Sequence, residues 1–273
     1  MKLIVNGRAA YAYTGGKAFD PALPCVVFIH GALNDHSVWT LLARWAAHHG
    51  HGVLALDLPG HSRSAGPVLP DVAALADWVL AAVTAAGVAP GTPLALVGHS
   101  MGSLIALEAA GRAPERVTRL VMVGSAYPMK VSAALLDTAA QAPDKAIAMV
   151  NQFSLSTLAA KPSFPGPGMW LHGSNRALMR RVLAGANATG CAVNLFHHDF
   201  QVCDAYAGGL DAAAAVTCPV TLVLGSADQM TPPSAARDIA AALKAKVLTL
   251  PAGHQLMAEA PAGLQAALAQ ALA

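Results

Sequence analysis

The hydrophobic pattern of this chain alternates between short continuous apolar runs and longer segments with helical spacing. Each apolar run has the length and continuity expected of a strand that is buried inside a parallel sheet. The runs cover residues 25–30, 52–56, 94–97, 118–123, 220–224 and 247–250. Between two of them, Val72, Leu75, Val79 and Val83 recur at helical spacing. Alternating strands and helices predict a doubly wound α/β fold, in which helices cover both faces of a mostly parallel sheet.

The N-terminal residues predict a β-hairpin. Residues 2–5 and 11–14 have the pattern of two short strands, and Asn6-Gly7 lies between them. The Asn-Gly pair favours a tight hairpin turn because both residues adopt positive φ angles readily. Together with the six apolar runs, the two hairpin strands give an expected sheet of eight strands.

The alternation of strands and helices stops in the middle of the chain. Residues 126–216 contain helical patches but no convincing buried strand, and the alternation resumes at residue 220. A helical segment inserted after the sixth strand accounts for this change. We therefore expect a core made of residues 1–125 and 217–273, with residues 126–216 forming a helical cap.

One motif lies where chemistry is expected in such a fold. A buried-strand run leads directly into Gly98-His99-Ser100-Met101-Gly102, and a helix-forming segment follows. A tight strand-to-helix turn of the G-x-S-x-G type holds its serine in a strained conformation, and the glycines leave room for neighbouring backbone. The turn exposes the Ser100 hydroxyl and directs the Met101 amide toward an oxyanion. The pattern predicts Ser100 as a nucleophile.

A serine nucleophile needs a base, and the base needs an acid that orients it. His254 follows the last predicted strand, and Asp228 follows the strand before it. Reactive groups in an α/β sheet gather at the C-terminal ends of the strands. Taken singly, Asp228 is also a common turn or helix-capping residue, and His254 is also compatible with an ordinary surface loop. Because Ser100, Asp228 and His254 each follow a strand end, catalytic roles are favoured over these alternatives.

The segment 98–102 resembles the nucleophile elbow of α/β-hydrolase fold enzymes, and the similarity extends over nearly the whole core but not specifically to the cap. The chain order Ser100, Asp228, His254 is the Ser–acid–His order of that family. Some members carry the acid after the sixth strand, but residues 124–126 contain no carboxylate here. The resemblance implies a catalytic triad of these three residues and no cofactor.

The resemblance also implies the second oxyanion donor. His30-Gly31-Ala32-Leu33 is similar to the His-Gly motif of the family, whose loop supplies a backbone amide beside that of Met101. Ala32 is the expected donor and Leu33 the lesser choice, whereas His30 is expected to be structural.

Candidate substrate contacts are less specific in this sequence. Leu33, His99, Trp170 and Met230 are the candidates, although His99 also suits a structural role inside the elbow. Residues 57–64, with His61, resemble a family loop that shapes the floor of the site and are expected to act as scaffold.

Aromatic and apolar residues are frequent in the expected cap. They include Phe153, Met169, Trp170, Leu171, Phe196 and Phe200. A cap of this kind favours a small-molecule substrate with an apolar acyl or alcohol group, although most of these residues are also compatible with packing inside the cap. His197-His198-Asp199 resembles a metal-ligand cluster only superficially, because adjacent residues do not converge easily on one ion. We expect no metal site.

Composition narrows the class of protein. The chain of 273 residues is 55% hydrophobic, but no apolar stretch reaches the ~18–20 residues that a membrane-spanning helix needs. A net charge of +2 without a dense basic run disfavours nucleic-acid binding. The 4 cysteines form no C-x-x-C pair, and the N-terminus lacks the apolar length of a secretory signal. We expect a soluble, cytoplasmic protein, and the sequence leaves its oligomeric state open.

The function expected from these features is hydrolysis of a carboxylic ester through an acyl-enzyme. The same triad also serves thioesterases, lactonases, acyltransferases, cofactor-free perhydrolases and C–C bond hydrolases, so these activities stay open. Ser100 argues against haloalkane dehalogenases and epoxide hydrolases, which carry Asp at that place. A ligand-binding or signalling protein that keeps the fold is the alternative from another class.

Overall fold

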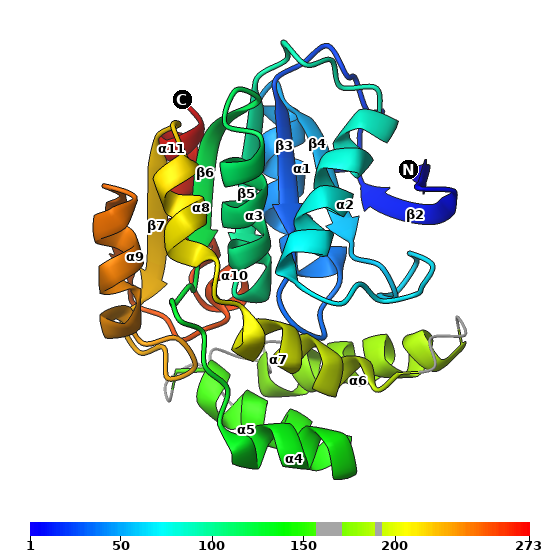
Figure 1. Ribbon diagram of the computed structural model, residues 1–273, viewed down its shortest axis with the longest axis vertical. Helices are drawn as coiled ribbons and strands as arrows, with labels where there is room; N and C mark the ends of the chain where they lie inside the picture. The colour runs from blue at the N-terminus through cyan, green and yellow to red at the C-terminus, as the bar shows by residue number, and fades with distance from the viewer. Residues whose placement is uncertain (157–170, 189–192) are drawn as a thin grey trace.

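A sheet of eight strands forms the centre of the computed structural model, which describes residues 1–156, 171–188 and 193–273 (Figure 1). In chain order the strands are β1 (Lys2–Val5), β2 (Arg8–Tyr13), β3 (Cys25–Ile29), β4 (Gly52–Asp57), β5 (Leu94–His99), β6 (Val117–Val123), β7 (Val220–Gly225) and β8 (Lys246–Leu250). Their order across the sheet is β1-β2-β4-β3-β5-β6-β7-β8. The pairs from β4 to β8 are parallel, whereas β2 is antiparallel to both of its neighbours. This confirms the predicted mostly parallel sheet of eight strands.

Helices cover both faces of the sheet, which explains why its central strands are continuous apolar runs. One face packs against α2 (Val72–Ala85), α3 (Met101–Arg112), α8 (Gly209–Ala215) and α9 (Arg237–Ala242). The other face packs against α1 (Thr40–His48), α10 (Leu256–Glu259) and α11 (Pro261–Leu272). Every residue of β3, β4, β5 and β7 is buried, whereas the edge strand β8 is partly exposed. The prediction of a doubly wound fold is confirmed.

The N-terminal hairpin has the turn that its sequence predicts. Val5 pairs with Arg8, so Asn6 and Gly7 alone make the turn, with φ angles of 50° and 77°. Positive φ at both positions matches the twist of the two strands. Because the turn is this short, β2 begins at Arg8 rather than at the predicted residue 11.

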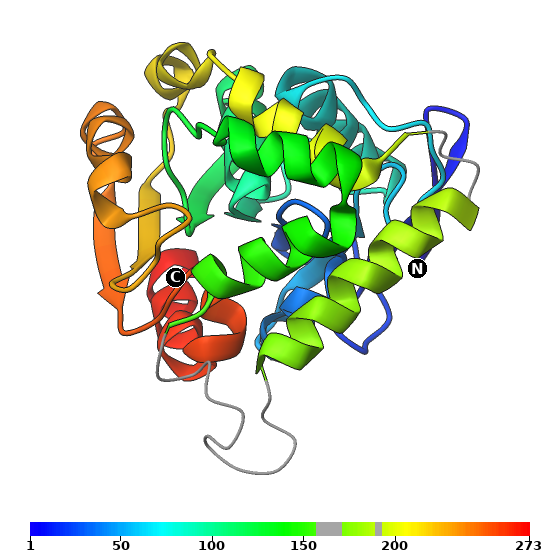
Figure 2. The same ribbon diagram turned by 90° about the horizontal axis from the view of Figure 1, so that it is seen from below.

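Four of the described helices form a separate layer at the C-terminal ends of the parallel strands (Figures 1 and 2). They are α4 (Ala133–Gln141), α5 (Pro143–Ser154), α6 (Leu171–Ala188) and α7 (Leu195–Ala205). Most of their buried side chains, among them Ile147, Met179 and Phe196, pack in a cluster apart from the two core clusters, whereas Val202 and Cys203 of α7 belong to the core cluster on the α3 face of the sheet. We call α4–α7 the helical layer; that it works as a cap, and the bounds of that cap, stay predictions.

The predicted insertion also contains α8, which packs with the core instead. The backbone of Ala212 in α8 lies so close to Gly111 of α3 that a β-carbon at position 111 would be 2.8 Å from the Ala212 carbonyl oxygen. Ala212 and Ala213 belong to the cluster on that face of the sheet. The expected cap, residues 126–216, therefore includes one helix that belongs to the core layer.

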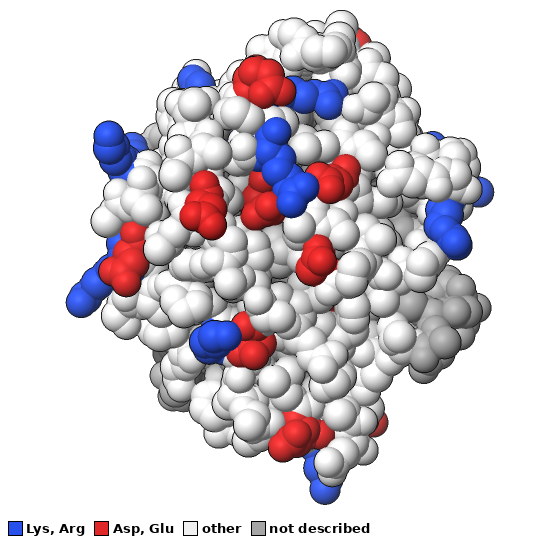
Figure 3. Space-filling view, viewed as in Figure 1, with Lys and Arg blue, Asp and Glu red and all other residues white. Residues whose placement is uncertain are grey.

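The charged side chains on the face drawn in Figure 3 are scattered, with Lys and Arg beside Asp and Glu. Within the described residues, Arg112 pairs with Asp77 and Glu108, and Arg180 pairs with Asp144. Among the helices that the structure describes, no segment is both long enough and apolar enough to cross a membrane.

The glycine before the elbow serine is required by close packing, which gives a stability prediction. A β-carbon at Gly98 would overlap the carbonyl oxygen of Gly102, so backbone rather than a flexible side chain would have to shift. We expect Gly98→Ala to lower the free energy of unfolding by about 3 kcal/mol, the upper part of the usual range for overpacking. Urea denaturation measures this change.

Gly185→Ala is the matched control for that substitution. Gly185 lies within α6, and outside its own helical turn a β-carbon there would meet no atom of the described residues within 4 Å. Alanine is the better helix former, so this variant should gain ~0.5–1 kcal/mol. Equal effects of the two substitutions would contradict the packing argument.

Candidate active site

Ser100 occupies a sharp turn between β5 and α3. Its φ and ψ angles are 51° and −120°, a region that residues with side chains rarely adopt. Backbone contacts hold the turn: the Ser100 N–H donates to the Val123 carbonyl at 2.9 Å, and the Ser103 N–H donates to the Ser100 carbonyl at 2.8 Å. The Ser100 side chain makes no capping hydrogen bond to α3. Its hydroxyl is therefore not engaged in holding the helix.

His254 and Asp228 lie together after β8 and β7. His254 Nδ1 and Asp228 Oδ2 are 2.8 Å apart, and both side chains are buried. Burial by itself would raise the pKa of Asp228, but the adjacent His254 and hydrogen bonds from Thr231 outweigh it and lower that pKa. Asp228 is therefore a carboxylate at neutral pH, and it accepts the Nδ1 proton of His254. The other ring nitrogen, Nε2, is left for a reaction partner.

Three residues that the sequence analysis did not identify hold His254 in place or extend its environment. The Thr231 hydroxyl donates to Asp228 Oδ2 at 2.7 Å and lies 3.0 Å from His254 Nδ1. The Ser154 carbonyl accepts from the His254 N–H at 2.7 Å, so the end of α5 contacts this loop. Gly124, with φ 54°, leaves room for the ring, because a β-carbon there would be 3.3 Å from His254 Nδ1. The contact of Thr231 with Asp228 spans three residues, whereas the contacts of His254 with Thr231, Ser154 and Gly124 are long-range, and no local motif marks them.

His99 supports the same loop from inside the elbow. Its Nε2 donates to the backbone carbonyl of His254 at 2.9 Å, and the two imidazole rings are 4.7 Å apart. Complete burial, together with the neighbouring His254, lowers the pKa of His99 to about 3. His99 is thus neutral and carries the structural role that the sequence analysis gave as an alternative, although it also lines the cavity described below.

The loop after β3 places two backbone amides differently. Ala32 lines the same cavity as Ser100, and its N–H has no acceptor among the described residues. The Leu33 N–H donates instead to Asp199 Oδ2 at 2.7 Å. Met101 is the first residue of α3, where an amide has no partner within the helix. The geometry thus leaves the amides of Ala32 and Met101 for a ligand, while that of Leu33 is occupied.

A cavity of about 310 Å³ contains both Ser100 and His254 in its lining. Most of its remaining wall is apolar and comes from the helical layer and the loops beside it. These residues are Met129, Val131, Leu135, Met149, Val150, Phe153, Met179, Phe200 and Met230. The volume lies within the range of small-molecule sites. The arrangement can enclose an apolar group next to the Ser100 hydroxyl.

The candidate substrate contacts fall into three groups. Met230 and His99 line the cavity. Leu33 does not, because its side chain is completely buried in the cluster under the helical layer, and a substrate contact at Leu33 stays a prediction. Trp170 lies outside the described residues. Phe196 is likewise buried within the helical layer, as the packing alternative implied.

Cys203 is a second potential nucleophile in the cavity wall. Its side chain is buried in α7, and burial raises the pKa of the thiol, as do the nearby carboxylates of Asp199 and Asp204. A thiol of raised pKa is a weak nucleophile because the thiolate is the reactive form. Ser100 is therefore the stronger candidate.

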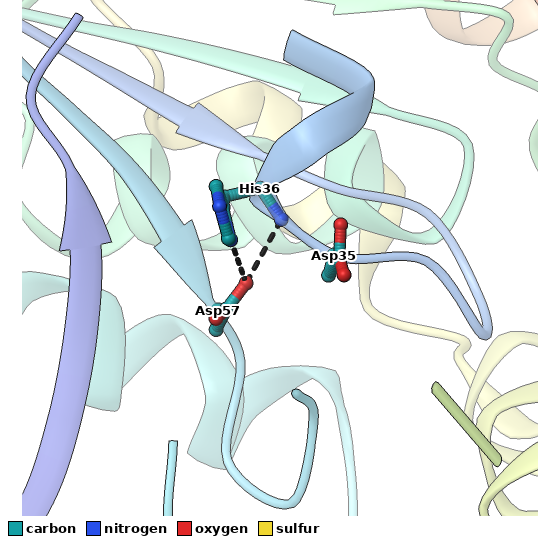
Figure 4. Close-up of side chains that lie close together, drawn as sticks. All are labelled: Asp35, His36 and Asp57. Carbon is teal, nitrogen blue, oxygen red and sulfur yellow. Dashed lines mark hydrogen bonds and ion pairs between the residues drawn. The ribbon is translucent and has the colours of Figure 1, made fainter. Parts of the chain in front are cut away.

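The residues 197–199 do not converge on one point. His198 Nε2 faces the Leu69 carbonyl at 2.9 Å, whereas Asp199 contacts His61. Asp35, His36 and Asp57 do come together, with potential ligand atoms within 4.8 Å of one another (Figure 4). The carboxylate oxygens of this cluster already accept hydrogen bonds. Asp57 accepts from the backbone N–H and the ring of His36, and Asp35 accepts from Ser37 and Arg181. These contacts explain the cluster as an anchor for the 3₁₀ turn His36–Trp39, which precedes α1.

The anchor at Asp35 gives a prediction for stability against pH. Burial would raise the pKa of Asp35, but hydrogen bonds from Ser37 and Arg181 lower it from 3.8 to about 2. A lowered pKa stabilises the fold above the ordinary value and loses that effect as the pH falls toward the folded-state value. We expect Asp35→Asn to cost about 2 kcal/mol at pH 7, a difference that shrinks between pH 4 and pH 2. Urea titrations of both proteins across this range measure it, and a difference independent of pH would contradict the assignment.

The comparisons with known proteins agree with this architecture. A family model described as alpha/beta hydrolase fold matches residues 24–261. The enol-lactonase from Burkholderia xenovorans LB400 superposes with a TM-score of 0.83 at 19% identity, over 100% of this chain and 99% of that one. At this identity, the likeness concerns the fold alone.

Curated relatives match over shorter stretches. The chain is 36% identical over 127 residues to the dihydrolipoyllysine-residue acetyltransferase component of an acetoin cleaving system from Pseudomonas putida, covering 46% of this chain and 32% of that protein. It is 38% identical over 101 residues to a pimeloyl acyl-carrier-protein methyl ester esterase from Methylococcus capsulatus, covering 37% and 36%. In both cases the matched segment spans about a third of the relative's length.

Proposed function

The chain belongs to the α/β-hydrolase fold family, and on this basis we propose that it hydrolyses a carboxylic ester of a small molecule through an acyl-enzyme on Ser100. One observation carries the proposal: Ser100 and His254 line a single cavity, and Asp228 Oδ2 lies 2.8 Å from His254 Nδ1. The relative from Methylococcus capsulatus is named as a methyl ester esterase, which supports this reaction class.

Acylation begins with proton transfer from Ser100. The Ser100 oxygen attacks the ester carbonyl carbon while His254 Nε2 takes the hydroxyl proton. The ionised Asp228 accepts the Nδ1 proton throughout, so it fixes the tautomer that leaves Nε2 as the base and stabilises the imidazolium that forms. Collapse of the tetrahedral intermediate breaks the bond to the alcohol, which leaves with the proton from His254.

The negative charge that develops on the carbonyl oxygen needs donors that are already in place. The amides of Met101 and Ala32 are the two donors, because both flank Ser100 and neither is used by the described part of the fold. Donors of this kind contribute about 10²–10³-fold each to the turnover rate. Water then attacks the acyl-enzyme with the same base and the same donors, and the carboxylic acid is released.

The cavity wall indicates the class of substrate. Its apolar side chains, such as Val150, Phe153 and Phe200, would contact an acyl or alcohol group without charge. With about 310 Å³ available, the cavity lies at the lower end of the range for small-molecule sites. We therefore assign an apolar small-molecule ester as the substrate class and the helical layer as the cap that encloses it.

A substrate panel tests the proposal. Turnover is measured on p-nitrophenyl esters, thioesters and lactones of graded size, and a serine-directed phosphonate locates the reactive residue by mass spectrometry. We expect turnover of apolar esters above the other classes and a single label on Ser100. Labelling with no turnover of any compound would favour the ligand-binding alternative, and absence of both would reject the proposal.

A further inference from the structure

A buried carboxylate of the helical layer contacts the loop that carries Ala32. Asp199 lies in α7 and is 2% exposed. Its Oδ2 accepts the Leu33 N–H at 2.7 Å and lies 2.9 Å from His61 Nε2. Asp199 is 166 residues from Leu33 and 138 from His61 along the chain. One carboxylate oxygen thus joins the loop after β3, the loop after β4 and helix α7.

The contact with His61 is an ion pair. Nε2 of His61 faces Asp199, and Nδ1 faces the Pro59 carbonyl at 3.2 Å. A carboxylate and a carbonyl only accept hydrogen bonds, so both ring nitrogens carry a proton and the imidazole is cationic. Burial by itself would lower the pKa of His61, but Asp199 more than compensates and raises it. The pair is buried on both sides, so its geometry is protected from water.

The Leu33 contact acts on a strained backbone. Leu33 has a φ angle of 51°, which is unfavourable for a residue with a side chain and persists only where the surroundings impose it. The Asn34 N–H donates to the Gly31 carbonyl at 3.2 Å and closes the turn from within. The Asp199 carboxylate is the acceptor that fixes the Leu33 peptide from outside the loop. Ala32 lies between these two fixed points.

We infer that Asp199 is a positioning residue, which holds the loop 31–34 so that the Ala32 amide points at the oxyanion of the reaction. The helical layer would then complete the catalytic geometry as well as enclose the substrate. This inference rests on the proposed ester hydrolysis at Ser100, since it concerns a donor used in that reaction.

Two substitutions at Asp199 separate its hydrogen bond from its charge. Asp199→Ala removes the acceptor of the Leu33 N–H, and we expect kcat to fall by ~10²-fold, as when one oxyanion donor is lost. KM should change by less than about threefold, because the donor acts in the transition state rather than on the bound ester. Asp199→Asn keeps an oxygen that can accept from Leu33, so it should restore kcat to within ~10-fold of wild type.

Asp144→Ala is the matched control in the same layer. Asp144 pairs with Arg180 on the surface of the helical layer and contacts no residue of the loop 31–34 among the described residues. Its kcat should equal that of wild type. If Asp199→Ala does not fold, the double variant Asp199→Ala/His61→Leu removes the buried cation together with its partner and should show the same loss of kcat.

A transition-state analogue provides a readout that a merely structural role would not change. Butylboronic acid forms a tetrahedral adduct with a reactive serine, so its Kd should rise in Asp199→Ala by the same factor by which kcat/KM falls, while the Kd of butyrate stays unchanged. Wild-type-like kcat in Asp199→Ala, or equal losses for boronic acid and butyrate, would overturn the inference. A wild-type enzyme without ester turnover and without a phosphonate label on Ser100 would instead reject the proposed function.

Discussion

Ser100→Ala is expected to abolish ester turnover and to leave the fold intact. In the proposed mechanism the serine supplies the protein atom that bonds to the substrate, and losses in such variants reach ~10⁶-fold in kcat. The fold should tolerate the change because the Ser100 side chain does not cap α3, and alanine meets the same strained φ angle as serine. Turnover of p-nitrophenyl butyrate and the Tm of both proteins measure the two effects.

Ser103→Ala is the control for that substitution. The Ser103 hydroxyl lies one helical turn away, donates to the Ser100 carbonyl at 2.6 Å and lies 2.7 Å from the Ser125 hydroxyl, from which it can accept. Its loss should cost about 1 kcal/mol of stability and less than ~10-fold in kcat, because it removes a hydrogen bond of the scaffold. If the two variants retained similar turnover, the nucleophile would be a different residue.

The fold was predictable where the local sequence itself indicates which residues are buried. Strands buried on both faces appear as continuous apolar runs, and this pattern located β3, β4, β5 and β7 to within a residue or two. The turn Asn6-Gly7 was equally explicit, because few residues adopt its φ angles. Less explicit in the sequence is the 3₁₀ turn His36–Trp39 that precedes α1, which Asp35 caps by accepting the Ser37 N–H.

The site was predictable only where a motif or a strand end marks it. The elbow, Asp228 and His254 follow strand ends, and parallel strands bring their C-terminal ends to one edge of the sheet. The sequence could not show that the Leu33 amide is hydrogen-bonded within the fold while the Ala32 amide is not. The acceptor of the Leu33 N–H is Asp199, which lies 166 residues away along the chain. The packing of α8 on α3 is hidden for the same reason: an alanine-rich helix fits a core layer and a cap equally well.

Asp228→Asn is expected to reduce turnover severely through the tautomer of His254. The Met230 and Thr231 amides both donate to Asp228 Oδ1, so the side-chain oxygen of asparagine must occupy that place. The carboxamide nitrogen then takes the place of Oδ2, which faces His254 Nδ1 at 2.8 Å. This nitrogen can only donate, so Nδ1 must accept and the ring proton moves to Nε2. His254 can no longer take the proton of Ser100.

The expected loss is ~10⁴-fold in kcat, the effect of the equivalent change in serine proteases. Stability should change little, since both backbone donors keep their acceptor. Because the pKa of Asp228 is lowered, the wild-type carboxylate is ionised at every pH above about 4. Protonation of Asp228 should therefore not change the ratio of wild-type to variant kcat between pH 6 and pH 8. Thr231→Val, which removes one hydrogen bond to Oδ2 but leaves the carboxylate, is the control and should lose less than ~10-fold. Near-normal turnover in Asp228→Asn, measured with p-nitrophenyl butyrate at pH 7, would mean that another carboxylate orients His254.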